Sequence, residues 1–211
     1  MAEMEPVFHI AHKVIFGNPM IRRPDLTRFL EGFYDEHGDF GFSINTTSFL
    51  ALRKPATMWA REEKDLKPDP DAFMQKRLYM GVFLTAPVPG NDHCLLPSPW
   101  VERQYLDYGP LFNALRGRKW VLAPHVIRAE GRFLANVFEV PSGYVVVVGL
   151  AGPKRSVPVT LRNLPISGYR AEAVVPGGET WKSIPIRLSR NHARIIVPVR
   201  RGGAVVRLIR P

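Results

Sequence analysis

The sequence predicts an α/β segment over residues 1–127, followed by an antiparallel all-β sandwich over residues 128–211. In the first part, apolar runs alternate with helix-like segments, an order typical of α/β architecture. The second part holds seven short apolar stretches separated by turn-forming residues. The charge changes at the same boundary. Residues 1–127 contain 15 Lys and Arg against 15 Asp and Glu, whereas residues 128–211 contain 14 against 4, so the whole net charge of +10 falls in the second part.

The first segment begins with an apolar run that predicts a strand, followed by a helix over residues 24–37. The helix is indicated by Pro24 at its start, by apolar side chains at helical spacing and by Gly38 as a stop. The candidate strands of this segment are the apolar runs at 7–16, 48–52 and 78–85.

Two further helices follow in the same segment. One is predicted over residues 70–76, with Asp69 or Asp71 near its amino end. The other is predicted over residues 108–116 and ends at Gly117. The order of the six elements is therefore strand, helix, strand, helix, strand, helix.

The second segment has the regular spacing of strands and turns that is typical of a β-sandwich. Its candidate strands are 133–140, 144–151, 156–161, 169–175, 181–188, 193–199 and 204–209. Three prolines lie inside these candidates, at Pro158, Pro185 and Pro198. Because proline removes a donor from the hydrogen-bond ladder, these positions predict sheet edges or bulges.

Composition excludes several classes of protein. The longest apolar run, 144–151, is far shorter than the roughly 20 residues that cross a bilayer, and the first thirty residues lack a signal pattern, so we expect a soluble chain. The single cysteine, Cys94, cannot form an intrachain disulfide, and no Cys/His framework is visible. We therefore expect neither a metal nor another cofactor.

The most distinctive stretch is residues 78–93, Leu-Tyr-Met-Gly-Val-Phe-Leu-Thr-Ala-Pro-Val-Pro-Gly-Asn-Asp-His. Together with residues 105–111 and 115–122, it resembles the last strand and helix of the TIM barrel in glycoside hydrolases of the α-galactosidase-like type. In that family an antiparallel β-sandwich commonly follows the barrel. The resemblance implies the C-terminal portion of a glycoside hydrolase-like enzyme that acts on glycosidic bonds, with a carbohydrate as its ligand.

The first segment is too short to be a whole barrel, because three strand-helix units cannot close an eight-stranded barrel of about 250 residues. Either it is a smaller α/β arrangement completed by the β-module, or an N-terminal barrel portion is missing. The family places its two catalytic carboxylates on middle strands, which would precede Met1. The resemblance therefore implies that this chain lacks a full catalytic pair, and it leaves the sugar, linkage and anomer open.

Two groups of polar residues are candidates for a sugar site. Asp35 and Glu36 lie at the carboxyl end of the first predicted helix, where the helix dipole opposes them, or they are an ordinary solvated helix end. Asn91, Asp92 and His93 follow an apolar strand, and in a barrel such loops build the active-site face. Their side chains suit hydrogen bonds to sugar hydroxyls, but they also suit a polar turn.

Tryptophan side chains can stack on the apolar faces of sugar rings. Trp100, in a stretch that the sequence predicts to be irregular, is the preferred stacking residue. Trp120 is expected where the α/β segment and the sandwich meet, and Trp181 in the sandwich core.

Two other functions remain open from the sequence. One is a non-catalytic module that binds polysaccharide or serves as a structural part. The other is a basic anion-binding protein, because the second segment is rich in arginine, although compositional bias with solvated outward strand positions is the favoured explanation of these residues. Nucleic acid is the least favoured partner, since no RNA-recognition signature is visible.

Overall fold

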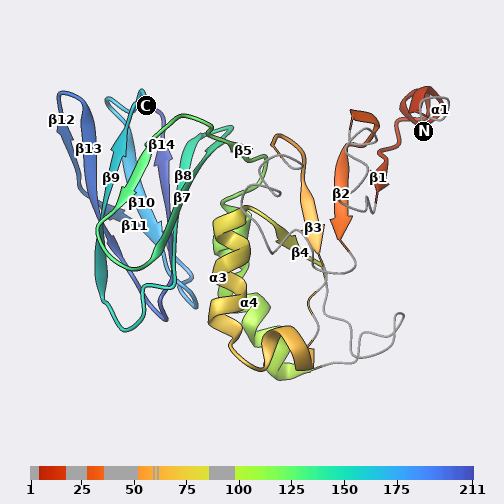
Figure 1. Ribbon diagram of the computed structural model, residues 1–211, viewed down its shortest axis with the longest axis horizontal. Helices are drawn as coiled ribbons and strands as arrows, with labels where there is room; N and C mark the ends of the chain where they lie inside the picture. Colours follow the sequence, from red (N-terminus) through yellow and green to blue (C-terminus); the bar gives the residue numbers. More distant parts are fainter. Residues whose placement is uncertain (1–4, 18–27, 36–51, 59, 61, 86–97) are drawn as a thin grey trace.

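The computed structural model describes residues 5–17, 28–35, 52–58, 60, 62–85 and 98–211. Their helices and strands form layers (Figure 1): a parallel sheet lies on one side of helices α3 and α4, and two antiparallel sheets lie on the other side. The N-terminus is at the parallel-sheet end of the molecule and the C-terminus is in the antiparallel part.

The parallel sheet has four strands in chain order. They are β1 (Phe16–Gly17), β2 (Gly32–Asp35), β3 (Ala56–Met58) and β4 (Phe83–Leu84), preceded by helix α1 (Glu5–Ile10). Each strand runs parallel to the next. Their apolar side chains form a small core with Phe33 and Val82 fully buried.

Two sequence predictions for this region are wrong. Residues 32–35 of the predicted helix 24–37 form β2, because Phe33 is fully buried in the sheet core and Gly32 lies directly against the ring of Phe16, where a Cβ atom would come within 2.3 Å. The predicted strand 7–16 begins instead as helix α1, in which Val7 is 66% exposed and Ile10 is 80% exposed. Without a buried face, an apolar run does not specify a strand.

The other two predicted strands of this region differ in outcome. Residues 48–51 of the predicted strand 48–52 lie outside the described residues, and the next described strand is β3. The first residues of the predicted strand 78–85 belong to helix α3, which runs from Pro70 to Met80. Gly81, with φ 64°, ends that helix before β4 begins.

Helix α3 (Pro70–Met80) follows a short π-helix, η3 (Glu62–Leu66), and confirms the helix predicted over 70–76. The Asp69 side chain caps it by accepting a hydrogen bond of 2.8 Å from the Ala72 amide. Helix α4 (Pro99–Asn113) begins well before the predicted start at residue 108. Ser98 caps its first turn and Pro99 occupies the first helical position, which is a helix-start pattern that the prediction passed over.

Every strand pairing within residues 119–211 is antiparallel, as the sequence predicts. A six-stranded sheet has the order β11-β10-β14-β8-β7-β5, and a four-stranded sheet has the order β12-β13-β9-β6. We call these two sheets the antiparallel module. Its strands are β5 (Lys119–Trp120), β6 (Ile127–Ala129), β7 (Leu134–Val140), β8 (Gly143–Gly149), β9 (Ser156–Arg162), β10 (Arg170–Val174), β11 (Lys182–Ile184), β12 (Ile186–Ser189), β13 (His192–Pro198) and β14 (Ala204–Ile209).

The six-stranded sheet is buried on both faces. Because side chains alternate along a strand, β8 directs Val146 and Val148 into the core between the two sheets and Val145 and Val147 into a second core against helices α3 and α4. All four valines are at most 1% exposed. The helices are therefore attached to the module by a continuous apolar contact.

The predicted strand 181–188 is divided at Pro185. Its first part, β11, is an edge strand of the six-stranded sheet, and its second part, β12, is an edge strand of the four-stranded sheet. Proline cannot donate to a ladder, so it is accommodated where the chain passes from one edge to another. The edge predicted at Pro185 is confirmed.

The two tryptophans of this region both contact the core between the helices and the six-stranded sheet. The ring of Trp120 meets Phe138 edge-on at a centroid distance of 5.1 Å, in agreement with its predicted place at the junction. Trp181 was expected in the core between the two sheets, but it lies on the opposite face, where the Arg207 guanidinium is 4.3 Å from its ring.

Candidate functional site

The carboxyl ends of the parallel strands form one edge of their sheet. The register places Asp35 beside Met58, and Met58 beside Leu84, so the last residues of β2, β3 and β4 form one row. Asp35 therefore lies at a strand end and not, as predicted, at the end of a helix. We call this row the carboxyl edge. Residues 36–51 follow Asp35 in the sequence and residues 86–97 follow Thr85, and all of them lie outside the described residues.

The other predicted site residues lie beyond this edge along the chain. Glu36, Asn91, Asp92 and His93 fall outside the described residues. The chain returns to described structure at Ser98.

Trp100 lies in the first turn of helix α4 and is 40% exposed, so it does not belong to an irregular stretch. The same helix contacts the residue that follows β4, since the Tyr105 hydroxyl donates a hydrogen bond of 2.7 Å to the carbonyl of Thr85. The amino-terminal turns of α4, with Trp100, thus lie beside the chain as it leaves β4.

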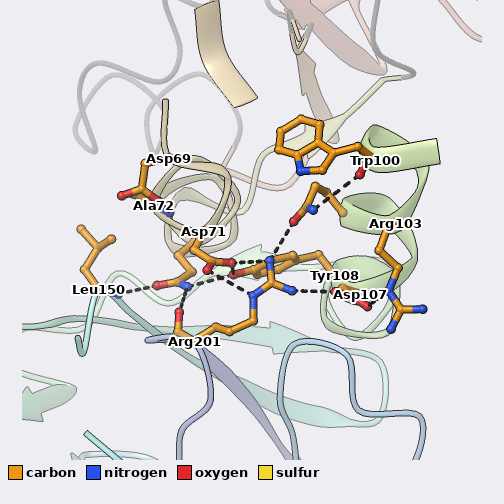
Figure 2. Close-up of polar contacts among 11 residues, drawn as sticks. Asp69, Asp71, Ala72, Trp100, Arg103, Asp107, Tyr108, Leu150 and Arg201 are labelled. Carbon is orange, nitrogen blue, oxygen red and sulfur yellow. Dashed lines mark hydrogen bonds and ion pairs between the residues drawn. The ribbon is translucent and has the colours of Figure 1, made fainter. Parts of the chain in front are cut away.

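A second polar cluster joins the helices to the antiparallel module (Figure 2), and the sequence did not predict it. Arg201, in the turn between β13 and β14, donates to Asp71 on α3 at 3.1 Å, and to Asp107 and Gln104 on α4 at 2.6 and 2.7 Å. The Tyr108 hydroxyl donates to Asp71 at 2.7 Å. We call these five residues the Arg201 clamp.

Gln75 extends the clamp to the backbone of the module. Its amide nitrogen donates to the Arg201 carbonyl at 2.7 Å and to the Tyr108 hydroxyl at 2.9 Å, and its amide oxygen accepts from the Leu150 amide at 2.7 Å. Gln75 is 1% exposed, so these bonds satisfy a polar group that would be costly to bury alone. Arg201 has a φ of 52°, a left-handed conformation that these contacts hold in place.

The electrostatics of the clamp suit a structural role. Burial by itself would lower the pKa of the Arg201 guanidinium, but the hydrogen bond and charge of Asp71, with a smaller contribution from Asp107, raise it overall. Burial raises the pKa of the Tyr108 hydroxyl, which therefore stays protonated and can donate to Asp71. Both carboxylates are bound to a permanent cation. Asp107 is thus bound in an ion pair with Arg201.

Helical spacing was the available signal for this cluster. Gln75 lies four residues after Asp71, and Asp107 and Tyr108 lie three and four residues after Gln104, so each set shares one helix face. Within the described ranges, no group of three or more His, Cys, Asp or Glu side chains is arranged to hold a metal ion, and no helix there is long and apolar enough to cross a membrane.

Comparison with known proteins gives structural similarity only. No family model and no curated protein matches the sequence. Among solved structures, the chain is similar to the catalytic domain of a GH30 xylanase C from Talaromyces cellulolyticus, with 12% identity and a TM-score of 0.48 over 100% of this chain and 55% of that one. It is also similar to an alpha-fucosidase from Thermotoga maritima, with 10% identity and a TM-score of 0.49 over 95% of this chain and 46% of that one.

An alpha-L-fucosynthase from Thermotoga maritima is similar at 10% identity and a TM-score of 0.45, over 85% of this chain and 42% of that one. The chain thus spans about half the length of these structures. Identities and TM-scores of this size assign neither a family nor an activity.

Proposed function

We propose that this chain is the C-terminal portion of a glycoside hydrolase-like, carbohydrate-active protein. In this proposal residues 1–127 are the last strand-helix units of a (β/α) barrel, and residues 128–211 are the β-sandwich that follows it. The observation that carries the proposal is the strand order. Four parallel strands are neighbours in chain order, and helices α3 and α4 follow β3 and β4 and separate the sheet from the antiparallel module. A barrel is wound in this order, whereas a doubly wound sheet reverses its order at a switch point.

The proposed sugar site lies at the carboxyl edge. Barrel enzymes build their active sites at this end of the strands. Asp35 lies in its terminal row, the segment with Asn91, Asp92 and His93 follows β4 in the sequence, and Trp100 lies where helix α4 begins. Carboxylate, amide and imidazole groups can hydrogen-bond sugar hydroxyls, and an indole can stack on a sugar ring.

In this proposal these residues bind the substrate, and they supply only some of the groups that hydrolysis requires. Hydrolysis of a glycosidic bond uses two carboxyl groups that flank it, about 5–9.5 Å apart according to the stereochemical outcome. Asp35, Glu36 and Asp92 are the candidate carboxylates that this chain itself supplies. A complete pair would require strands of a barrel portion that precedes these residues.

The first test is the mass of the natural protein, measured by intact mass spectrometry with an antibody against the antiparallel module. A species well above 23.9 kDa that hydrolyses aryl glycosides supports the enzyme. A species at 23.9 kDa that binds oligosaccharides without turnover supports a non-catalytic binding protein instead.

Site variants test the location. We expect Asp35→Asn, Asp92→Asn and Trp100→Ala each to weaken oligosaccharide binding by about tenfold in calorimetry, a loss typical of one hydrogen bond to a charged group or one stacked ring. Circular dichroism should stay unchanged. Glu102→Gln, an exposed carboxylate in the same first turn of α4, is the matched control and should bind normally. Normal affinity in all three site variants would remove the carboxyl edge from the site.

A further inference from the structure

The outer face of the four-stranded sheet is exposed and strongly basic. Along β13 the side chains alternate between buried and exposed, with Ala193, Ile195 and Val197 in the core between the sheets. The outward positions of this strand therefore include His192 and Arg194.

The strand register brings arginines from three strands into one row across this face. Arg187 on β12 pairs with Arg194 on β13, Arg194 pairs with Thr160 on β9, and Thr160 pairs with Arg128 on β6. All three arginines are exposed. We call Arg187, Arg194 and Arg128 the arginine row. With neighbouring strands about 4.8 Å apart, the row spans about 14 Å across this face.

A second row, two residues further along, adds to the positive charge. His192 on β13 pairs with Ser189 on β12 and with Arg162 on β9. His192 and Arg162 are both exposed. Arg162 thus adds a cation beside the arginine row, together with the imidazole of His192 and the hydroxyl group of Ser189.

This arrangement of like charges lowers the stability of the fold. Like charges directly opposite each other on neighbouring strands repel, yet Arg187 and Arg194 are such a pair. Among the described residues, only Glu130 forms an ion pair with the arginine row. Its carboxylate lies 3.4 Å from the guanidinium of Arg194, and both side chains are nearly half exposed. A single exposed pair offsets little of the repulsion.

We propose that the arginine row binds a linear anionic polysaccharide, one that carries carboxylate or sulfate groups along its length. Guanidinium groups bind such oxyanions with two parallel hydrogen bonds, and an extended chain laid across the strands can meet several of them at once. The charges of this face support an anion site. The choice of a polysaccharide as the anion also rests on the proposed function.

Single-stranded nucleic acid fits this face less well. Binding of single strands depends on aromatic rings that stack on successive bases. Among the described outward positions of the four strands there is no Phe, Tyr or Trp. The basic charge is therefore present without the stacking surface that bases require.

The test measures binding of the full chain to immobilised polygalacturonate and heparin as NaCl rises from about 50 to about 200 mM, a range in which a contact with several ion pairs weakens steeply. The double variant Arg187→Gln and Arg194→Gln should lose at least about tenfold in affinity and show a shallower salt dependence, because two charge contacts are gone. The matched control is Arg170→Gln with Lys182→Gln. It removes the same charge from exposed positions on the six-stranded sheet and should keep normal affinity.

Three outcomes would overturn the proposal: no binding of either polyanion at low salt, an equal loss in both double variants, or tighter binding of single- or double-stranded DNA than of the polysaccharides. Thermal unfolding of the control double should match the parent, since its changed side chains are exposed, and the arginine-row double should be at least as stable as the parent, since it removes a like-charge pair. Binding of a neutral oligosaccharide reports on the carboxyl edge alone and should be the same in both double variants, so failure of the carboxyl-edge site and failure of the arginine row give different results.

Discussion

Replacing Arg201 by alanine should separate the contribution of the Arg201 clamp from that of the apolar contact beside it. The side chain joins the turn between β13 and β14 to both helices through Asp71, Asp107 and Gln104. Its removal leaves two carboxylates without their shared cation. Asp107 is only 10% exposed and keeps Arg103 at 3.0 Å, an arginine that is itself 68% exposed.

The expected cost follows from these exposures. Removing one partner of a fully buried ion pair costs about 3–5 kcal/mol. The Arg201 and Asp71 side chains are 28% and 31% exposed, so water replaces part of the lost interaction. We therefore expect Arg201→Ala to lower the free energy of unfolding by about 2–3 kcal/mol, which corresponds to a fall of roughly 5–10 °C in Tm for a chain of this size.

A glycine at the same position provides an internal comparison. Arg201 has a φ of 52°, which a non-glycine residue adopts at a cost of about 1 kcal/mol. Arg201→Gly loses the same side-chain contacts but relieves this strain. It should therefore be more stable than Arg201→Ala by about 1 kcal/mol.

Urea unfolding followed by circular dichroism and tryptophan fluorescence measures these differences. The cycle of Arg201→Ala with Asp107→Asn isolates the ion pair, and we expect a coupling of at least about 1 kcal/mol. Arg200→Ala, an exposed residue in the same turn, is the control and should stay within about 0.5 kcal/mol of the parent. A loss below about 0.5 kcal/mol for Arg201→Ala would refute the clamp as a stabilising contact.

Three further predictions concern other contacts. Tyr108→Phe removes a donor to Asp71 and an acceptor for Gln75, and it should cost about 1–2 kcal/mol in urea unfolding; a neutral effect would show that water replaces the hydroxyl. The hydrogen bond from the Ile15 amide, followed by that from His9, lowers the pKa of Glu31, so its stabilisation is present above the ordinary carboxyl pKa and is lost as the pH falls through the lowered value. The protection of the Ile15 amide, its NMR exchange rate relative to that of a free amide at the same pH, should fall there, but not in Glu31→Gln, which should already be weakly protected at neutral pH. Val146→Ala and Val147→Ala should each cost about 2 kcal/mol although they face opposite sides of one strand, and a near-neutral result for Val147→Ala would contradict the packing of the helices on the sheet.

The antiparallel part was predictable because its signals are local. Turn residues mark the ends of its strands, and an alternating pattern needs only neighbouring residues to be recognised. The parallel strands are different, since they have two to four residues each and depend on contacts with distant parts of the chain. Gly32 against the ring of Phe16 is such a contact, and without it the aromatic residues that follow resemble one side of a helix.

The Arg201 clamp was out of reach for a related reason. The spacing of polar residues on α3 and α4 indicates a face that meets something polar, but not what it meets. Arg201 lies 130 positions from Asp71 and 94 from Asp107 along the chain. Only the packing of the helices on the six-stranded sheet brings the three side chains together. For the carboxyl edge, the sequence supplied Asp35 as a candidate, and the strand register supplied its position.

Strand β8 is buried on both of its faces, and this limits how the antiparallel module can be transferred to another protein. A cut between residues 127 and 128 would leave a β-rich piece that lacks β5 and exposes Val145, Val147 and Val205 to water. Such a fragment would associate through that surface instead of remaining monomeric. Gene fusions that transfer the antiparallel module to another protein would therefore have to carry α3 and α4 with it, and the smallest transferable cassette begins before α3, well inside the α/β segment.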